Sequence, residues 1–413
     1  MKSLLVFTYF WICIILLSSG CGSGDSAEKL GALEAFAEMV QAGVKPIALS
    51  HPMSTQEADA LWPEAEIIAE KYGIAIYREP DLIYSCLFDH SSLGDQEVFI
   101  MYSGQNLGAY LAYKERVKSL DRIENPAEVE QISRSFGRLL GYPTWRINDL
   151  LASQSDFRDL EDFGVQGHEL IWFYRDLPAA KRFYLETLGL KLVEETEEVV
   201  KFQIAGDSYL VLKDVKVSPY SGDENKSVAL ALLTDNLEDW YTHVQEKGVE
   251  IKYTLKQNPE GAHDGFVAVD PEGYLLEFET FLQHPENEKL MPRLRAQNPQ
   301  ETAMGGNLNF YSSVTWLYYN DMLPMQNWVE ETLGLELVVD QGWAKVYALS
   351  DQSYLGLVDG LRGMNQFSES KLVEFGVLLE EPKGWEQYLK KKAVDSARVE
   401  GTFQDLGGYL FRF

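Results

Sequence analysis

The sequence is poor in cysteine and in basic residues. It has three cysteines in 413 residues: Cys13 inside an apolar N-terminal run, Cys21 four residues after that run, and Cys86. We therefore expect no intrachain disulfide in the mature chain. The 36 basic residues face 64 acidic ones, which gives a formal net charge of -28. Such a charge repels phosphate backbones, so nucleic acid is excluded as a partner.

A membrane-spanning run is also missing. The apolar run at 4–17 is shorter than the roughly 20 residues needed to cross a bilayer, and Ser18-Ser19-Gly20-Cys21 follows it. This pattern is similar to a bacterial lipoprotein signal peptide, with small residues before a cysteine that accepts lipid. We predict a signal peptide at 1–20, a flexible tether at 21–28, lipid on Cys21 as the membrane anchor and an extracytoplasmic place in the cell envelope. The alternatives are a plain cleavable signal and an uncleaved anchor.

Residues 29–160 predict an α/β domain of unknown function, because helical and strand-like patterns alternate. Ser54 and Glu57 form a capping-box pattern, and Gly43 and Gly73 end the first two helices. Helices are expected at 30–40, 54–72, 106–120, 127–140 and 147–151, and strands at 44–49, 74–77 and 97–102.

A polar cluster at 85–92 contains Cys86, Asp89 and His90. Nucleophilic catalysis needs such groups in contact, but sequence neighbours rarely reach that geometry. We interpret the cluster as a turn-forming loop in which Cys86 is a buried, inert thiol.

The second half of the chain repeats itself. Glu186-Thr187-Leu188-Gly189-Leu190 recurs as Glu331-Thr332-Leu333-Gly334-Leu335, and Gly273-Tyr274-Leu275 recurs as Gly408-Tyr409-Leu410. Each copy contains two smaller units in the order strand, helix, three strands. We therefore predict four βαβββ modules, in domains at 165–283 and 308–413 joined by a polar linker at 284–307.

These motifs carry a family resemblance. Leu188-Gly189-Leu190, together with Asp270-Pro271-Glu272-Gly273 and the strand after it, resembles the vicinal oxygen chelate superfamily of glyoxalases, bleomycin-resistance proteins and extradiol dioxygenases. The resemblance implies an α+β fold in which the four modules pair into two open barrels, after the N-terminal α/β domain. It is strong over 168–281 and weaker over 314–413, so the second barrel is interpreted as degenerate.

The resemblance also implies a divalent metal, such as Fe, Zn, Mn or Ni, held by the first and last strands of paired modules. Carried over, the positions are Glu169, Val211, Ala229 and Glu277 in the first barrel, and Val314, Gly356, Glu374 and Arg412 in the second. Arginine cannot bind a cation, so Glu374 and Arg412 are expected to form an ion pair. A slip of one residue would place His168 inside in place of Glu169.

We favour an envelope-tethered module that binds a small molecule without an intact metal site. An apolar, aromatic-lined cavity would supply the site, and the candidates for its lining are Ile171, Phe173, Phe202, Phe266 and Phe278, with His263 and Tyr274 nearby. The alternatives are a metal-dependent enzyme of glyoxalase, isomerase or dioxygenase type in the first barrel, and a protein-interaction scaffold of the envelope.

Overall fold

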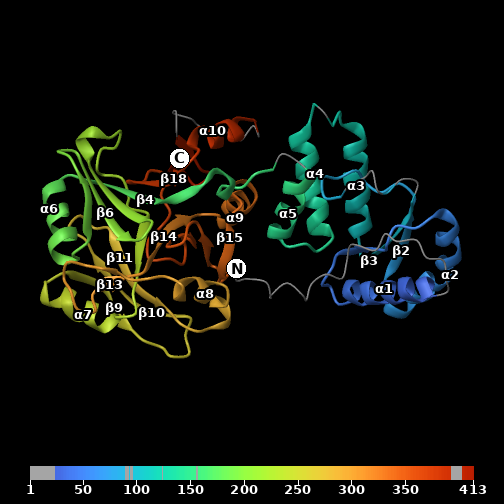
Figure 1. Cartoon of the computed structure of the whole chain (residues 1–413), viewed down its shortest axis with the longest axis horizontal. Helices are drawn as coiled ribbons and strands as arrows, with labels where there is room; N and C mark the ends of the chain where they lie inside the picture. The colour runs from blue at the N-terminus through green and yellow to red at the C-terminus, as the bar shows by residue number, and fades with distance from the viewer. Residues whose placement is uncertain (1–23, 89–92, 94–95, 123, 155–156, 392–401) are drawn as a thin grey trace, which may run out of the picture. The chain divides into compact units, whose positions relative to one another are not determined.

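The computed structural model describes residues 24–88, 93, 96–122, 124–154, 157–391 and 402–413 (Figure 1). The predicted signal peptide and Cys21 lie outside these residues. The chain divides into two compact units, Met1–Ser155 and Asp156–Phe413, which are described separately. Among the described residues, no helix combines the length and apolar character that crossing a bilayer requires.

The first unit has a three-stranded sheet with the order β1-β3-β2, in which both outer strands run antiparallel to β3. Most elements lie within a few residues of their predicted ranges, but α1 begins at Gly24, inside the stretch predicted as a flexible tether, because extending a formed helix costs little. The elements are α1 (Gly24–Gln41), β1 (Ile47–Leu49), α2 (Thr55–Tyr72), β2 (Ala75–Glu79), β3 (Val98–Tyr102), α3 (Asn106–Ser119), α4 (Pro126–Leu139) and α5 (Thr144–Gln154).

Local signals in this unit act as predicted. The Ser54 hydroxyl accepts from the backbone N–H of Glu57, whose carboxylate accepts from the Ser54 N–H at 2.9 Å, so the capping box starts α2. Gly73 ends the helix in the left-handed conformation. Cys86 is partly buried and its backbone N–H donates to Ser133 Oγ at 2.9 Å, whereas Asp89 and His90 lie outside the described residues.

The second unit contains the four modules. Module 1 has β4 (Val165–Tyr174), α6 (Leu177–Arg182), β5 (Lys191–Glu195), β6 (Val199–Ala205) and β7 (Ser208–Asp214); module 2 has β8 (Val228–Leu233), α7 (Leu237–Glu246), β9 (Glu250–Lys256), β10 (His263–Val269) and β11 (Leu275–Phe281). Module 3 has β14 (Ser312–Tyr319), α9 (Met322–Trp328), β15 (Glu336–Asp340), β16 (Ala344–Ala348) and β17 (Ser353–Asp359); module 4 has β18 (Val373–Leu379), α10 (Pro382–Lys391), β19 (Thr402–Gln404) and β20 (Leu410–Arg412). Residues 392–401, between α10 and β19, lie outside the described residues, so the remaining strand expected in module 4 is untested.

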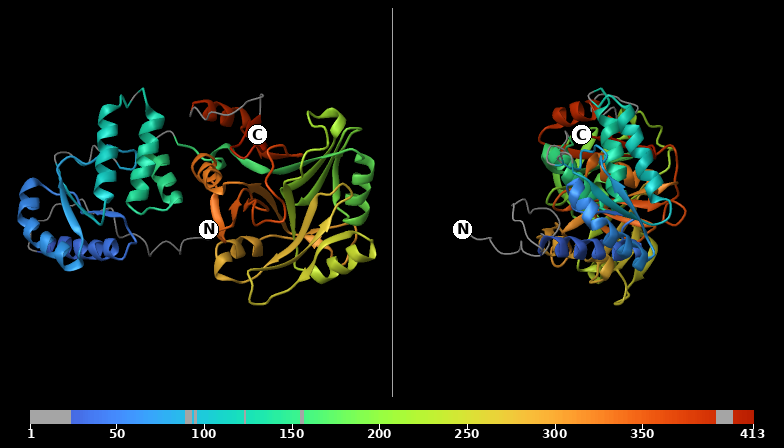
Figure 2. Two further views of the ribbon diagram at one scale, coloured as in Figure 1. Left: turned by 180° about the vertical axis from the view of Figure 1, so that it is seen from behind. Right: turned by 90° about the vertical axis from the view of Figure 1, so that its right-hand side faces the viewer.

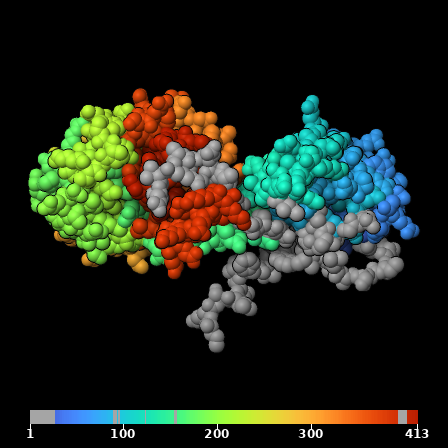
Figure 3. Space-filling model, turned by 90° about the horizontal axis from the view of Figure 1, so that it is seen from above, coloured from blue at the N-terminus to red at the C-terminus, as the bar shows by residue number. Residues whose placement is uncertain are grey.

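The modules pair into two sheets, but the pairing differs from the one assumed for the metal site, which combined module 1 with module 2 and module 3 with module 4. One sheet has the order β15-β16-β17-β14-β8-β11-β10-β9 and joins module 3 to module 2; the other, β19-β20-β18-β4-β7-β6-β5, joins module 4 to module 1 (Figure 1). The first strand of every module is an edge whose N–H and C=O groups need a partner, and a sequence repeat does not specify which module supplies it. Figures 2 and 3 show the C-terminal residues, in red, beside the green module 1.

One face of each sheet contributes to a shared core between the sheets and their helices, including Trp172, Tyr184, Trp240 and Phe375. We call the opposite face of each sheet its site face, because it carries the positions predicted as metal ligands. The region predicted as a linker contains α8 (Leu290–Arg295) and β12 (Gln300–Glu301), which is paired with β13 (Asn309–Phe310). Leu290 and Leu294 of α8 pack on the site face of the eight-stranded sheet.

Two tyrosines connect the two sheets by hydrogen bonds. Tyr274 follows the turn before β11, yet its hydroxyl accepts from Phe173 N at 3.0 Å and donates to Leu372 O at 2.7 Å, at the end of the β4–β18 ladder in the other sheet. Tyr409, which precedes β20 in the seven-stranded sheet, reaches the end of the β8–β14 ladder in the eight-stranded sheet. There its hydroxyl accepts from Tyr318 N at 2.7 Å and donates to Ser227 O. We call this pair the seam tyrosines.

Candidate functional site

The site face of the seven-stranded sheet is neutralised by ion pairs. Arg412 donates from Nε and Nη2 to the carboxylate of Glu374, the second bond at 2.9 Å, as expected from the sequence. Lys201 donates to Glu169 and lies 4.2 Å from the centre of the Tyr209 ring. The register places Val211 of β7 opposite Ile171, so the remaining ligand position is apolar. Both carboxylates therefore have cationic partners within the chain.

His168 is not available as a ligand. Its ring is buried, stacks on Phe375 with centroids 4.1 Å apart, and lies on the core face. Nδ1 lies 2.7 Å from Gly376 O, which can only accept, so Nδ1 carries the proton and Nε2 accepts from Thr315 Oγ1 at 2.9 Å. Burial lowers the pKa of His168 to about 4. The ring is a neutral link between sheets, and the alternative register that placed it inside the site is wrong.

The site face of the eight-stranded sheet contains two carboxyl groups in an apolar setting. Glu277 and Glu279 alternate along β11, so both side chains project from the same face. Glu279 is 2% exposed, whereas Glu277 keeps some exposed surface, so solvent reaches one of the two carboxyls. We call the place where these two side chains lie the carboxyl recess. Among the described residues, no lysine or arginine nitrogen lies within 4.0 Å of either carboxyl.

Burial raises the pKa of Glu277 to about 7, although the facing Trp316 side chain favours its charged form. Burial and the neighbouring Glu277 charge raise the pKa of Glu279 well above its usual range. The Nδ1 atom of His263 lies 4.0 Å from Glu279 Oε1, and burial lowers the pKa of this ring. Near neutral pH the pair therefore holds at least one proton.

One buried polar atom at this recess lacks any partner. Glu279 Oε2 has no hydrogen-bond partner among the described residues, whereas Trp316 Nε1 makes no hydrogen bond of good geometry but lies close enough to Glu277 to lower its pKa. Trp316 lies against Gly356, where an added Cβ would meet its ring at 2.1 Å, so glycine at this predicted ligand position makes room for the indole. Buried polar groups without partners are rare in proteins and call for an explanation.

The residues do not fit the divalent metal that the resemblance implied. At the positions carried over, the eight-stranded sheet has Ala229, Val314 and Gly356 beside Glu277, and the seven-stranded sheet has Val211 and Arg412 beside two ion-paired glutamates. Among the described residues, no three His, Cys, Asp or Glu side chains are grouped closely enough to hold a metal ion. Such sites need three or four protein donors. The ligand sets that we carried over combined Glu169 with Glu277, which lie in different sheets.

Most of the predicted aromatic lining belongs to the shared core. Phe202, Phe266 and Phe278 lie there, and so does Tyr274, whose ring stacks on Trp172 with centroids 4.2 Å apart. Phe173, with Ile171, lies on the site face of the seven-stranded sheet, where Tyr220 covers it at 4.6 Å. Of the residues predicted near the cavity, His263 and Glu277 lie at the carboxyl recess.

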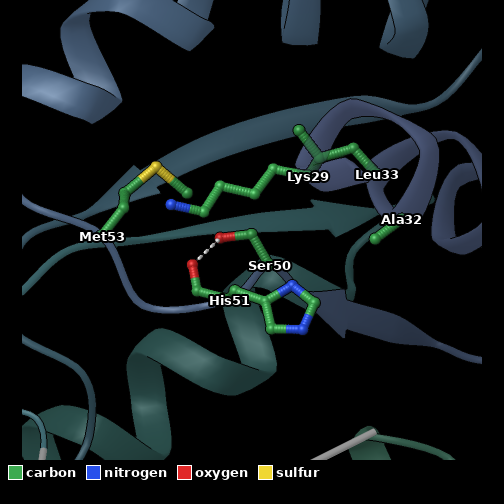
Figure 4. A pocket seen from close by; sticks show the side chains of 6 residues that line it. All are labelled: Lys29, Ala32, Leu33, Ser50, His51 and Met53. Carbon is green, nitrogen blue, oxygen red and sulfur yellow. Dashed lines mark hydrogen bonds between the residues drawn. The ribbon is translucent and has the colours of Figure 1, made fainter. Parts of the chain in front are cut away.

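Two hollows lie elsewhere. In the first unit, a small hollow with an empty volume of about 200 Å³ is lined by Lys29, Ala32, Leu33, Ser50, His51 and Met53. Figure 4 shows the Lys29 side chain extending across it towards Met53, and the Ser50 hydroxyl donating to His51 O at 2.9 Å. In module 1, a surface hollow with an empty volume of about 760 Å³ lies between α6 and the β5–β6 turn, where Lys181 and Glu195 form an ion pair at 2.6 Å. Neither hollow contains a predicted site residue.

Comparison with known proteins agrees with the fold. Residues 168–278 match the model of the Glyoxalase/Bleomycin resistance protein/Dioxygenase superfamily. These residues of the second unit therefore contain a domain of this superfamily, which is also called the vicinal oxygen chelate superfamily. No curated protein sequence matches the chain.

Solved structures similar to this chain include proteins named as glyoxalases and dioxygenases. A putative dioxygenase from Bacillus subtilis is 15% identical, with a TM-score of 0.44 over 60% of this chain and 84% of that one. Glyoxalase I from Zea mays is 15% identical, with a TM-score of 0.39 over 59% of this chain and 89% of that one. A glyoxalase/bleomycin resistance protein/dioxygenase from Alicyclobacillus acidocaldarius is 25% identical, with a TM-score of 0.22 over 27% of this chain and 89% of that one.

Proposed function

We propose that this protein is a small-molecule-binding module of the cell envelope that works without a divalent metal, and that its ligand binds at the recess of Glu277 and Glu279. The observation that carries the proposal is the buried, unpartnered atom Glu279 Oε2. A bound molecule would give this atom the partner that the chain does not supply.

The other sheet supports this choice by contrast. Its carboxylates at the equivalent face, Glu169 and Glu374, are already paired with Lys201 and Arg412. Their charges are paired within the chain, so among the described residues that face has no unpartnered buried carboxylate comparable to Glu279. A metal-dependent reaction would need donors that neither sheet brings together.

The test is a thermal-shift screen of the full chain against a compound library, with and without EDTA. We expect hits whose stabilisation is unchanged by EDTA, is lost in Glu277→Gln, and is retained in Glu169→Gln, which changes a glutamate on the site face of the other sheet. Stabilisation that disappears with EDTA, or that survives Glu277→Gln, would contradict the proposal.

Envelope localisation rests on the sequence around Cys21 and is part of the same proposal. Cys21 would accept a diacylglyceryl group and hold the chain at the membrane surface. Metabolic labelling with radioactive palmitate tests it. We expect label and membrane association in the natural chain and neither in Cys21→Ala, whereas an unlabelled natural chain would refute lipid anchoring.

A further inference from the structure

We infer that the recess of Glu277 and Glu279 selects a primary ammonium group, so that the ligand is an organic amine. This inference rests on the proposed function and names its ligand class. The starting point is geometry, since two carboxyl groups project from one strand face and are matched by no lysine or arginine among the described residues.

Once the carboxyl pair is ionised, which is the state that a cation would bind, the missing hydrogen bond calls for a donor. Glu279 Oε2 is buried and can only accept when the carboxylate is ionised. A primary ammonium has three N–H donors and one positive charge, so it supplies both the missing donor and the missing countercharge. A carboxylate or phosphate ligand would instead add charge of the wrong sign to a face that already has an excess of negative groups.

The surrounding side chains favour an organic cation over a metal ion. Tyr311, Trp316 and Tyr318 pack in the apolar cluster on the site face, so aromatic side chains share that face with both carboxyls. These three side chains lie in or beside β14, which pairs with β8 next to β11. Aromatic faces attract organic cations but do not complete the donor set of a metal ion.

Proton release follows from the same arrangement. The ammonium binds the ionised carboxyls, whereas the empty pair holds a proton near neutrality. Binding must therefore displace that proton, and the apparent affinity for an amine must rise with pH as the carboxyl pair ionises. An amine ligand is itself protonated throughout this range.

The experiment titrates the full chain with four probes of similar size, namely butylammonium, butyltrimethylammonium, 1-butanol and butyrate, at constant ionic strength. The indole N–H signal of Trp316, assigned with Trp316→Phe, reports binding by NMR. We expect butylammonium to shift this signal, with an affinity at least about tenfold higher than that of the other three probes. The affinity should rise between pH 6 and pH 8 and fall at least about tenfold in Glu279→Gln.

Glu169→Gln is the matched control and should bind butylammonium like the natural chain. Equal binding of butanol and butylammonium, or full binding in Glu279→Gln, would overturn the inference. If a neutral or anionic library compound binds through Glu277 while butylammonium does not, the ligand class is wrong and the proposed function stands. If no compound of any charge binds, both are wrong.

Discussion

Replacing Glu277 with glutamine should make the protein more stable at neutral pH. The folded chain holds the Glu277 proton more tightly than the unfolded chain does, because burial raises its pKa from 4.5 to about 7. A carboxyl with a raised pKa binds more protons in the folded state, so its contribution to stability falls as the pH rises from 4.5 to 7. Glutamine keeps the shape of the side chain and removes this dependence.

The magnitude follows from the pKa values. A change from 4.5 in the unfolded chain to about 7 in the folded chain corresponds to at most about 3 kcal/mol, because Glu277 keeps some exposed surface. At pH 8 the Glu277→Gln chain should therefore be more stable than the natural chain by up to that amount. Near pH 4.5 this advantage disappears.

Denaturant unfolding of the full chain, followed by tryptophan fluorescence at several pH values, measures the difference. Glu246→Gln in α7 is the control, since it changes an exposed glutamate of the same module and should leave the pH profile as it is. A stability difference between Glu277→Gln and the natural chain that stays constant from pH 4.5 to pH 8 would refute the reasoning.

Two further predictions concern stability. Tyr409→Phe removes the hydroxyl that satisfies the buried N–H of Tyr318, so it should cost about 1–3 kcal/mol in denaturant unfolding, and no measurable loss would show that water replaces the hydroxyl. Arg412→Leu leaves Glu374 buried and unpaired and should cost about 3 kcal/mol, reduced by the 41% exposure of the arginine side chain. The double variant with Glu374→Leu should recover much of this loss, and equal losses in the single and double variants would contradict the ion-pair account.

Local elements were predictable because their signals lie close together in the sequence. The capping box of Ser54 and Glu57 and the glycine stop at Gly73 act within one turn of helix. The repeated Gly-Tyr-Leu motif located β11 and β20 for the same reason. The resemblance to the superfamily added the module order, which the strands of the second unit confirm.

Pairing between modules was not predictable in this way. Each module presents the same open strand edge, whether the module that pairs with it comes from its own repeat or from the other repeat. The local sequence therefore does not distinguish pairing within a repeat from pairing between repeats. The ligand sets carried over from the resemblance depended on that choice, and the sets drawn for the site were therefore wrong.

The candidate site was found only in part. Glu277 was predicted at a ligand position, and the alternation along its strand contained the signal for Glu279, since residues two apart share a face. Trp316 could not be foreseen, because it belongs to module 3 and reaches the recess through the β8–β14 contact. The ion pair between Lys201 and Glu169 was missed although alternation also places Lys201 on that face.

The seam tyrosines have a consequence for any truncated form of the protein. Residues 168–278 match the superfamily model as a contiguous stretch, but the hydroxyl of Tyr274 bonds to Leu372, and β4 pairs with β18. A fragment ending near 283 would carry two bare strand edges and a tyrosine without its acceptor, and would associate with itself or remain unfolded. The second unit can complete its fold only after β20, its last strand, has left the ribosome. The reason is that the ladder between β4 and β18 joins strands from opposite ends of the unit.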